Sequence, residues 1–357
     1  MSDKLYIDSH KLHYHPTAVA DWNNGKRIYP VSLEISPSGA CNHRCKFCSQ
    51  SYLGYKRHFL DLNSLMPILI NLKDKGVKSI VMAGEGEPLL NPQISQMVFE
   101  INQKAHMDVA MSTNAVLMTK DVSEAILPYL SWIRISLNAS NPSMYQAVHK
   151  CSDINDFSKV LENIQNAVSV KKNFSIPVTI GVQYVLISEN SDLDGLLTLA
   201  AQLKNIGVDY FSIKPYSIHP LSKSEVEPYD FNNFGTVYRK LNALSNDTFN
   251  VIIRENSIDH ILEAKQYKKC LGIPFWAYID SQFNVWPCLA YIGVEKYRYG
   301  NLLIQTADDV FEGRRHMKIV NDMCSMDITV CRKSCRLDPI NEYLWRLKNG
   351  QLHQNFI

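Results

Sequence analysis

Cys41-Asn42-His43-Arg44-Cys45-Lys46-Phe47-Cys48 is the stretch around which this 357-residue chain is organised. It places three cysteines at spacing C-x3-C-x2-C, after an alternating apolar run at residues 31–36 and a Pro-Ser-Gly break at residues 37–39. The run predicts a strand and the break predicts a loop, so three thiols can converge on one point. A structural zinc site usually takes four ligands, whereas three thiolates suit a [4Fe–4S] cluster with one open iron.

The composition is that of an ordinary globular protein. The chain is 46% hydrophobic and 20% charged, with a formal net charge of +2. Nothing in this balance demands nucleic acid or an anionic membrane as a partner, and no apolar run has transmembrane length. Residues 1–24 lack the apolar core of a signal peptide, so we expect a cytoplasmic protein. In a reducing compartment nine cysteines favour metal ligation over disulfides.

Strand and helix patterns alternate along the first 215 residues. Strands are predicted at residues 31–36, 77–83, 108–112, 132–138, 178–186 and 208–214. Helices are predicted between them at residues 62–75, 93–105, 121–130, 156–172 and 193–206. Alternation of this kind favours βαβ units and an α/β fold with a parallel sheet.

Several of these strands carry polar residues on one face. Glu34, Arg134, Gln183 and Lys214 alternate with apolar neighbours, although a sheet covered by helices on both faces should be apolar throughout. Because unpaired buried polar groups are costly, this face is predicted to line an interior that holds water or a ligand. The pattern predicts an active site inside a barrel, independently of the cysteines.

The cysteine motif, with Phe47 directly before its last cysteine, resembles the signature of the radical S-adenosylmethionine (SAM) superfamily. The resemblance implies a partial (β/α)6 parallel barrel and a [4Fe–4S] cluster held by Cys41, Cys45 and Cys48. It also implies SAM on the open iron, reductive cleavage of SAM to a 5′-deoxyadenosyl radical, and an electron donor such as flavodoxin or ferredoxin. Hydrogen abstraction from a substrate carbon would follow.

The resemblance also implies SAM contacts at the ends of the strands. Three positions depart from the family pattern: Glu85 in the turn after the second strand, Ala115 after the third strand, and Asn138 in the fourth strand. A helix cap is the alternative role for residues 112–114. The residues expected to contact SAM are Phe47, Gly86, Glu87, Pro88, Ser112, Asn114, Ser136 and Gln183.

A second cysteine group follows residue 265. A predicted hairpin (residues 276–280 and 283–287) lies between Cys270 and Cys288, and a distant pair, Cys331 and Cys335, comes later. This layout resembles the twitch and SPASM auxiliary domains, which implies a small C-terminal α+β domain holding one auxiliary [4Fe–4S] cluster. Cys324 is an alternative ligand, and zinc is the alternative metal. Cys151 or Cys324 could instead donate a hydrogen atom to a substrate radical.

The predicted organisation is an N-terminal extension (1–30), a radical SAM core (31–216), connecting helices or a lid (217–265), the auxiliary domain (266–345) and a tail (346–357). By analogy with twitch enzymes, the expected substrate is a sugar, aminosugar or nucleotide that undergoes oxidation or epimerisation. Candidate substrate contacts are Glu34, Arg134, Lys214 and Tyr216, with a Lys214–Glu34 ion pair as the alternative for the lysine. Modification of a ribosomally made peptide, or a non-enzymatic zinc or iron–sulfur protein, are the alternative functions.

Overall fold

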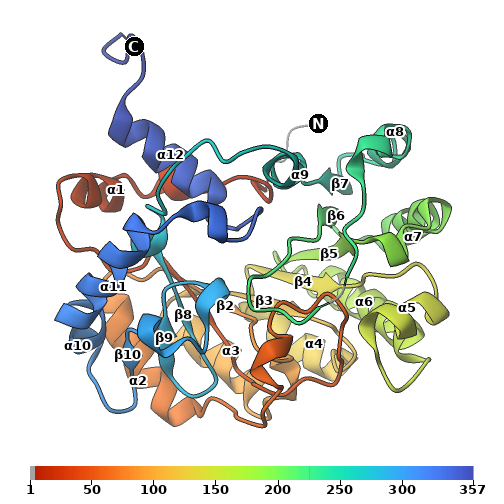
Figure 1. The fold of residues 1–357 in the computed structure, drawn as a ribbon. Coiled ribbons are helices and arrows are strands. Elements are labelled where there is room, and N and C mark those ends of the chain that lie inside the picture. The colour runs from red at the N-terminus through yellow and green to blue at the C-terminus, as the bar shows by residue number, and fades with distance from the viewer. Residues whose placement is uncertain (1–4, 225, 357) are drawn as a thin grey trace.

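The computed structural model describes residues 5–224 and 226–356. Its centre is one ten-stranded sheet in the order β10-β9-β8-β1-β2-β3-β4-β5-β6-β7 (Figure 1). The run from β8 to β7 is parallel, and only the β8–β9 and β9–β10 pairs are antiparallel. The fold is a mixed α/β partial barrel, as the alternation of strands and helices predicts.

The strands match the six predicted ones closely and add others. Their bounds are β1 (Ser32–Ile35), β2 (Ser79–Met82), β3 (Asp108–Thr113), β4 (Trp132–Ser136), β5 (Thr179–Leu186), β6 (Tyr210–Pro215), β7 (Asn250–Ile253), β8 (Trp276–Ile279), β9 (Asn284–Trp286) and β10 (Gly300–Asn301). Strand β7 lies in a segment for which only connecting helices were expected. The predicted C-terminal hairpin exists as β8 and β9, but β8 also pairs with β1 and so continues the barrel sheet.

The helices α2 to α7, which connect β1 to β6, lie along the outer side of the curved sheet (Figure 1). The bounds of the α-helices are α1 (Pro16–Asn23), α2 (Leu62–Asp74), α3 (Ile94–Gln103), α4 (Lys120–Ile126), α5 (Pro142–His149), α6 (Asp156–Asn173), α7 (Leu193–Ile206), α8 (Gly235–Asn242), α9 (Glu255–Leu262), α10 (Ala307–Phe311), α11 (Arg314–Ser325) and α12 (Asp338–Asn349). The capping is conventional: Asp61, Thr119, Asn141 and Asp192 each accept a backbone N–H at a helix start.

One hydrophobic core runs between the sheet and these helices. Leu33 and Ile35 of β1, Ile133 of β4 and Val182 of β5 are fully buried in it. These residues alternate with the polar ones, so the apolar face of each strand meets the helices and the polar face points to the inside of the barrel. A smaller core joins Leu12 and the N-terminal helix α1 to α12.

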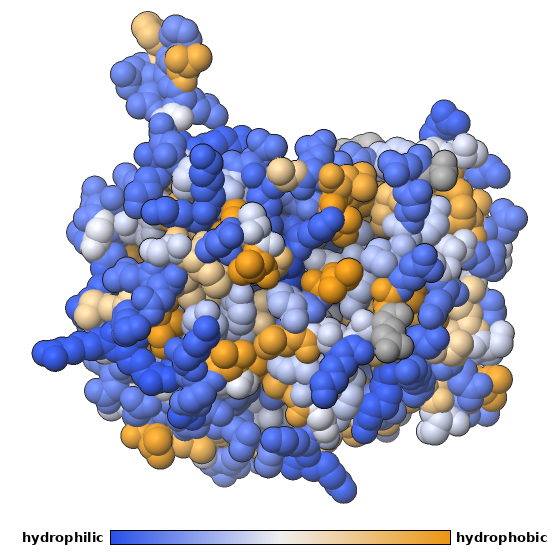
Figure 2. Space-filling model, in the orientation of Figure 1, coloured by the Kyte–Doolittle hydropathy of each residue, from blue (hydrophilic) through white to orange (hydrophobic). Residues whose placement is uncertain are grey.

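The view in Figure 2 shows a mostly hydrophilic face with small hydrophobic patches near its centre. None of the helices in the described part of the chain has both the length and the apolar character needed to cross a bilayer.

Candidate active site

The cysteine loop leaves the carboxyl end of β1, the end at which parallel barrels place their active sites. Gly39 donates to the carbonyl of His58 at 2.8 Å, and an added Cβ at Gly39 would lie 2.7 Å from the carbonyl oxygen of Lys56. The loop then turns back on itself, with the N–H of Cys48 donating to the carbonyl of Cys45 at 3.1 Å. Cys41, Cys45 and Cys48 are free thiols.

The chemistry of these thiols fits a metal cluster. Burial, with the nearby Glu87 carboxylate, raises the pKa of Cys41 to about 12. Burial also raises the pKa of Cys45 well above its usual value, and the neighbouring Cys48 and Cys41 raise it further. Three partly buried thiols placed this close together are stable as thiolates only when a bound cation compensates their charge. The donor set therefore matches three cluster ligands.

A histidine from another segment supports the loop. His149, the last residue of α5, places Nδ1 3.3 Å from Sγ of Cys45. Its Nε2 accepts the backbone N–H of Asn138 at 3.1 Å, so the proton of the neutral ring lies on Nδ1 and is donated to the sulfur. Burial holds the pKa of His149 well below its usual range, which keeps the ring neutral. Sequence reasoning missed His149, because nothing in its local sequence marks it.

The turn after β2 contacts the cysteine loop directly. An added Cβ at Gly86 would lie 2.0 Å from the carbonyl oxygen of Ala40, so only glycine fits at this position. The next N–H, that of Glu87, donates to the same carbonyl at 2.8 Å, and Pro88 begins a short 3-10 helix. The turn predicted to bind SAM thus lies against the residue that precedes Cys41.

The carboxylate of Glu87 ties this turn to the end of β3. It accepts the Thr113 hydroxyl at 2.5 Å and the Asn114 N–H at 2.8 Å. Asn114 in turn donates from Nδ2 to Oδ1 of Asn42 in the cysteine loop at 2.7 Å. Hydrogen bonds therefore join the three segments that the sequence assigns to the cluster and SAM. No helix begins at Asn114, since α4 is capped by Thr119.

Glu85 connects the turn to the C-terminal hairpin. Its carboxylate accepts the Ser281 N–H at 2.8 Å, and its own N–H donates to the hydroxyls of Ser36 and Tyr278, both at 3.1 Å. Burial raises the pKa of Glu85, and the Asp280 carboxylate raises it further. Glu85, which departs from the family pattern, therefore joins the turn after β2 to the C-terminal hairpin through Ser281.

The other residues predicted to contact SAM have different surroundings. Phe47 packs in a small apolar cluster and meets the ring of His149 edge-on at 5.6 Å. Ser112 accepts Nε and Nη2 of Arg134, both at 3.3 Å. Ser136 and Gln183 are register partners on β4 and β5, and Oε1 of Gln183 is buried without a hydrogen-bond partner in the described part of the chain.

Four of the C-terminal cysteines influence one another. Burial raises the pKa of Cys270 and Cys288, and in each case Cys335 is the next cause. Cys331 acts on Cys288 and on Cys335, whose pKa burial and Asp338 raise to about 11. Donors also point at the sulfurs: Asn341 Nδ2 lies 3.6 Å from Cys270 Sγ. The proximity of these four cysteines agrees with the predicted ligand set of an auxiliary cluster. That ligand set stays a prediction.

The two cysteines considered as hydrogen-atom donors each donate their S–H to a backbone carbonyl. Cys324 on α11 donates its S–H to the carbonyl of Cys270 at 3.1 Å. Cys151 is buried, donates to the carbonyl of Asp153 at 3.2 Å, and has its sulfur within 4.8 Å of ligand atoms of His43 and Asp156. This position behind the cysteine loop favours a packing role for Cys151.

Glu34 and Tyr216, two of the predicted substrate contacts, are both buried. Glu34 forms an ion pair with Arg336 from the C-terminal region. The hydroxyl of Tyr216 has no hydrogen-bond partner among the described residues. The ion-pair partner of Glu34 is therefore Arg336, and not Lys214 as in the alternative considered from the sequence.

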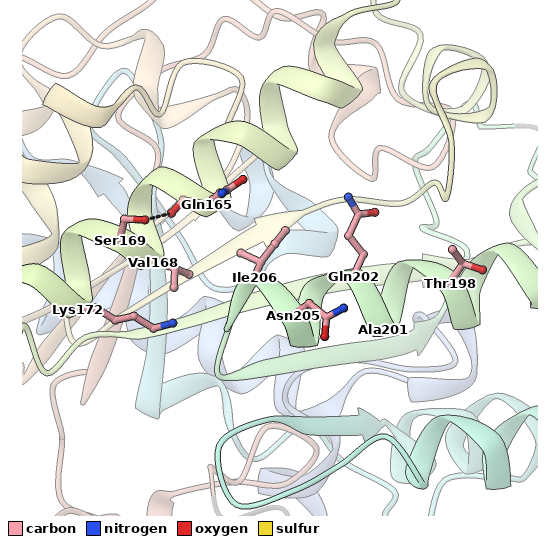
Figure 3. Close-up of a pocket in the computed structure, with 9 residues that line it drawn as sticks. All are labelled: Gln165, Val168, Ser169, Lys172, Thr198, Ala201, Gln202, Asn205 and Ile206. Carbon is pink, nitrogen blue, oxygen red and sulfur yellow. Dashed lines mark hydrogen bonds between the residues drawn. The ribbon is translucent and has the colours of Figure 1, made fainter.

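A surface groove of about 610 Å³ lies on the outer layer, between α6 and α7 (Figure 3). Its lining includes Gln165, Lys172 and Gln202, which come from the helical shell. Among the described residues no cysteine lines this groove, so the groove is separate from the candidate active site.

Comparison with known families agrees with the geometry. Residues 35–192 match the Radical SAM superfamily. The chain is 28% identical over 242 residues to the dual-specificity RNA methyltransferase RlmN of Buchnera aphidicola subsp. Cinara cedri, covering 63% of this chain and 65% of that protein. It is 26% identical over 187 residues to the GTP 3',8-cyclase of Petrotoga mobilis, covering 51% and 55%. The chain thus spans about half to two thirds of the length of these curated relatives.

Solved structures share the fold. SuiB of Streptococcus suis bound to S-adenosylmethionine matches with a TM-score of 0.65 and 18% identity, covering 89% of this chain and 74% of that one. The structure of anSMEcpe with bound AdoMet matches with a TM-score of 0.54 and 18% identity, covering 87% of this chain and 90% of that one.

Proposed function

We propose that this chain, whose residues 35–192 form a radical SAM domain, oxidises or epimerises a small polar substrate such as a sugar, aminosugar or nucleotide. The family implies a [4Fe–4S] cluster and SAM. When bound, they supply a 5′-deoxyadenosyl radical that removes a hydrogen atom from the substrate. The observation that carries the proposal is the hydrogen-bonded junction of the cysteine loop, the Gly86–Pro88 turn and the end of β3.

The chain's own residues have distinct tasks in this proposal. Cys41, Cys45 and Cys48 would hold the cluster, and His149 donates a hydrogen bond to the Cys45 sulfur. Glu87 joins the turn to the end of β3, which would hold both segments in place beside SAM. Holding SAM and substrate together inside the barrel would supply the proximity that radical transfer needs.

The C-terminal cysteines would hold one auxiliary [4Fe–4S] cluster. Such a cluster could accept the second electron in an oxidation or orient the substrate. Strand β8 pairs with β1, and Glu85 accepts the Ser281 N–H, so this region is hydrogen-bonded to the barrel beside the SAM turn. Electrons for SAM cleavage would come from a flavodoxin or ferredoxin. Modification of a peptide is the competing proposal, supported by the fold shared with SuiB bound to the precursor peptide SuiA.

The reaction outcome can be tested with the anaerobically reconstituted protein, SAM, reductant and candidate sugars and nucleotides. A substrate should increase 5′-deoxyadenosine release above the level with SAM alone. A product two mass units lighter would indicate oxidation, and one solvent deuterium at carbon would indicate epimerisation. Stimulation by peptides alone, with none by small molecules, would contradict the proposed substrate class.

A further inference from the structure

Five cationic side chains converge near the inner face of the barrel, and we call them the cationic cluster: Arg134, Lys214, Arg254, Arg332 and Arg336. Arg134 on β4 is in register with Gly181 on β5, and Gly181 with Tyr210 on β6. Register partners in a parallel sheet point to the same side, so Arg134 and Tyr210 share a face. Lys214 lies four residues after Tyr210 on the same strand and therefore on that face too.

The remaining members come from β7 and the C-terminal region. The N–H of Arg254, the residue after β7, donates to the carbonyl of Ile213, next to Lys214. Nη2 of Arg332 lies 3.3 Å from the carbonyl oxygen of Ser217, three residues beyond Lys214. Arg336 crosses to Glu34 on β1. Burial and the four guanidinium groups around it hold the pKa of Lys214 well below its usual range.

The carboxylates near the cluster do not neutralise it. Asp8 pairs with Arg254 at 3.3 Å, and Glu34 pairs with Arg336. No ion pair with a carboxylate is found for Arg134, Lys214 or Arg332 within residues 5–224 and 226–356. Arg134 instead donates to the neutral Ser112 hydroxyl. Arg134, Lys214 and Arg332 are each partly buried. Partly buried cations that no carboxylate neutralises are costly, so a bound anion would relieve an unfavourable term.

Neutral polar atoms in the same place also lack partners. Gln183 is 6% exposed and Ser212 is fully buried, yet neither Oε1 of Gln183 nor Oγ of Ser212 has a hydrogen-bond partner in the described chain. The two residues are register partners on β5 and β6, on the face that carries Lys214. Nε of Arg332 is a third buried atom without a partner. Unsatisfied groups beside unpaired cations are typical of a ligand site.

We propose that the cationic cluster binds a phosphate group of the substrate, with Arg134, Lys214 and Arg332 as its charge contacts. This inference rests on the proposed function and narrows its substrate class to phosphorylated small molecules. A phosphate carries close to two negative charges and three acceptor oxygens, which matches three unpaired cations better than the single charge of a carboxylate. Asp8 and Glu34 hold the two flanking arginines in place.

Pyrophosphate, titrated calorimetrically into the reconstituted full chain, is the probe. Wild type should bind it, and Lys214→Met and Arg332→Gln should each weaken binding by at least about tenfold. Lys172→Met, in the outer groove of Figure 3, is the matched control and should bind as wild type does. SAM affinity should be unchanged in all three variants. Succinate, a dicarboxylate, should bind more weakly than pyrophosphate.

Absence of pyrophosphate binding, or equal binding by all variants, would overturn the inference, as would tighter binding of succinate. Parallel loss of SAM affinity would assign the cluster to the SAM carboxylate and also overturn it. If iron content or thermal stability shows that Lys214→Met misfolds, Arg134→Lys and Arg134→Gln replace it in the test. Arg134→Gln, which removes the charge, should weaken pyrophosphate binding more than Arg134→Lys, which keeps it. Release of 5′-deoxyadenosine with SAM alone separates the two proposals. If only the phosphate inference is wrong, the protein should still release 5′-deoxyadenosine; if the proposed function is wrong, it should release none.

Discussion

His149 donates a hydrogen bond from Nδ1 to Sγ of Cys45 across 3.3 Å, and the Asn138 N–H fixes the tautomer that does so. Hydrogen bonds to cluster sulfurs stabilise the reduced, more negative state and raise the reduction potential. His149→Phe, which keeps a ring beside Tyr145, should therefore lower the midpoint potential of the first cluster in an EPR-monitored redox titration.

The matched control is His316→Phe. His316 is another histidine beside a tyrosine, partly buried, with its ring 4.3 Å from that of Tyr299. This variant should leave the potential of the first cluster unchanged. An equal shift in both variants, or none in His149→Phe, would show that the Cys45 contact does not tune the cluster.

Titration of His316 should make the stability of the folded protein depend on pH. Burial, with the charge of Arg27, lowers its pKa from 6.5 to about 4. The unfolded state therefore binds the proton more readily, and stability falls as pH drops below 6.5 towards 4. Between pH 6.5 and pH 5 wild type should lose about 1–2 kcal/mol more than His316→Phe in denaturant titrations. Parallel pH profiles of the two proteins would contradict this cause.

Gly86→Ala tests the contact between the turn and the cysteine loop. The added methyl would lie 2.0 Å from the Ala40 carbonyl oxygen, so the turn must move away. We expect SAM affinity to fall about 10- to 100-fold, with iron content retained. Gly235→Ala is the control, because an added Cβ there meets nothing within 4 Å. Unchanged SAM affinity in Gly86→Ala would place SAM elsewhere.

The C-terminal cysteines give a prediction about metal content. Reconstituted wild type should hold about eight irons if two [4Fe–4S] clusters form. Cys288→Ala should lose about four of them, whereas Cys324→Ala should lose none, because Cys324 donates to the Cys270 carbonyl. Equal losses would make Cys324 a ligand, and about four irons plus one zinc in wild type would replace the auxiliary cluster by a zinc site.

Local sequence patterns predicted the strands β1 to β6 of the barrel. They did not predict strand β7 or the pairing of β8 with β1, which depend on contacts between distant segments. The six strands from β1 to β6 followed from alternation of strand and helix signals, and their polar faces from period-two patterning. The four-residue strand β7 lies after a long connection, and its pattern was too short to stand out. The pairing of β8 with β1 joins segments some 240 residues apart, which no local signal specifies.

The same limit applies to the site. The cysteine loop, the Gly86–Pro88 turn and Asn114 carried motifs, and hydrogen bonds join them in the structure. His149 and the cationic members Arg254, Arg332 and Arg336 carried none, because their positions depend on tertiary packing. Glu85 departed from the expected pattern, and only the structure shows its contact with Ser281.

The most direct test of the account is release of 5′-deoxyadenosine from SAM by the reduced, reconstituted protein. Wild type should release it, and Cys41→Ala, Cys45→Ala and Cys48→Ala should each release none while keeping the iron of the C-terminal site. Cys151→Ala, which alters a buried thiol behind the loop, should still release it. No release by wild type with an intact first cluster, or equal release by the Cys45→Ala variant, would contradict the assignment of this loop as the SAM-cleaving site.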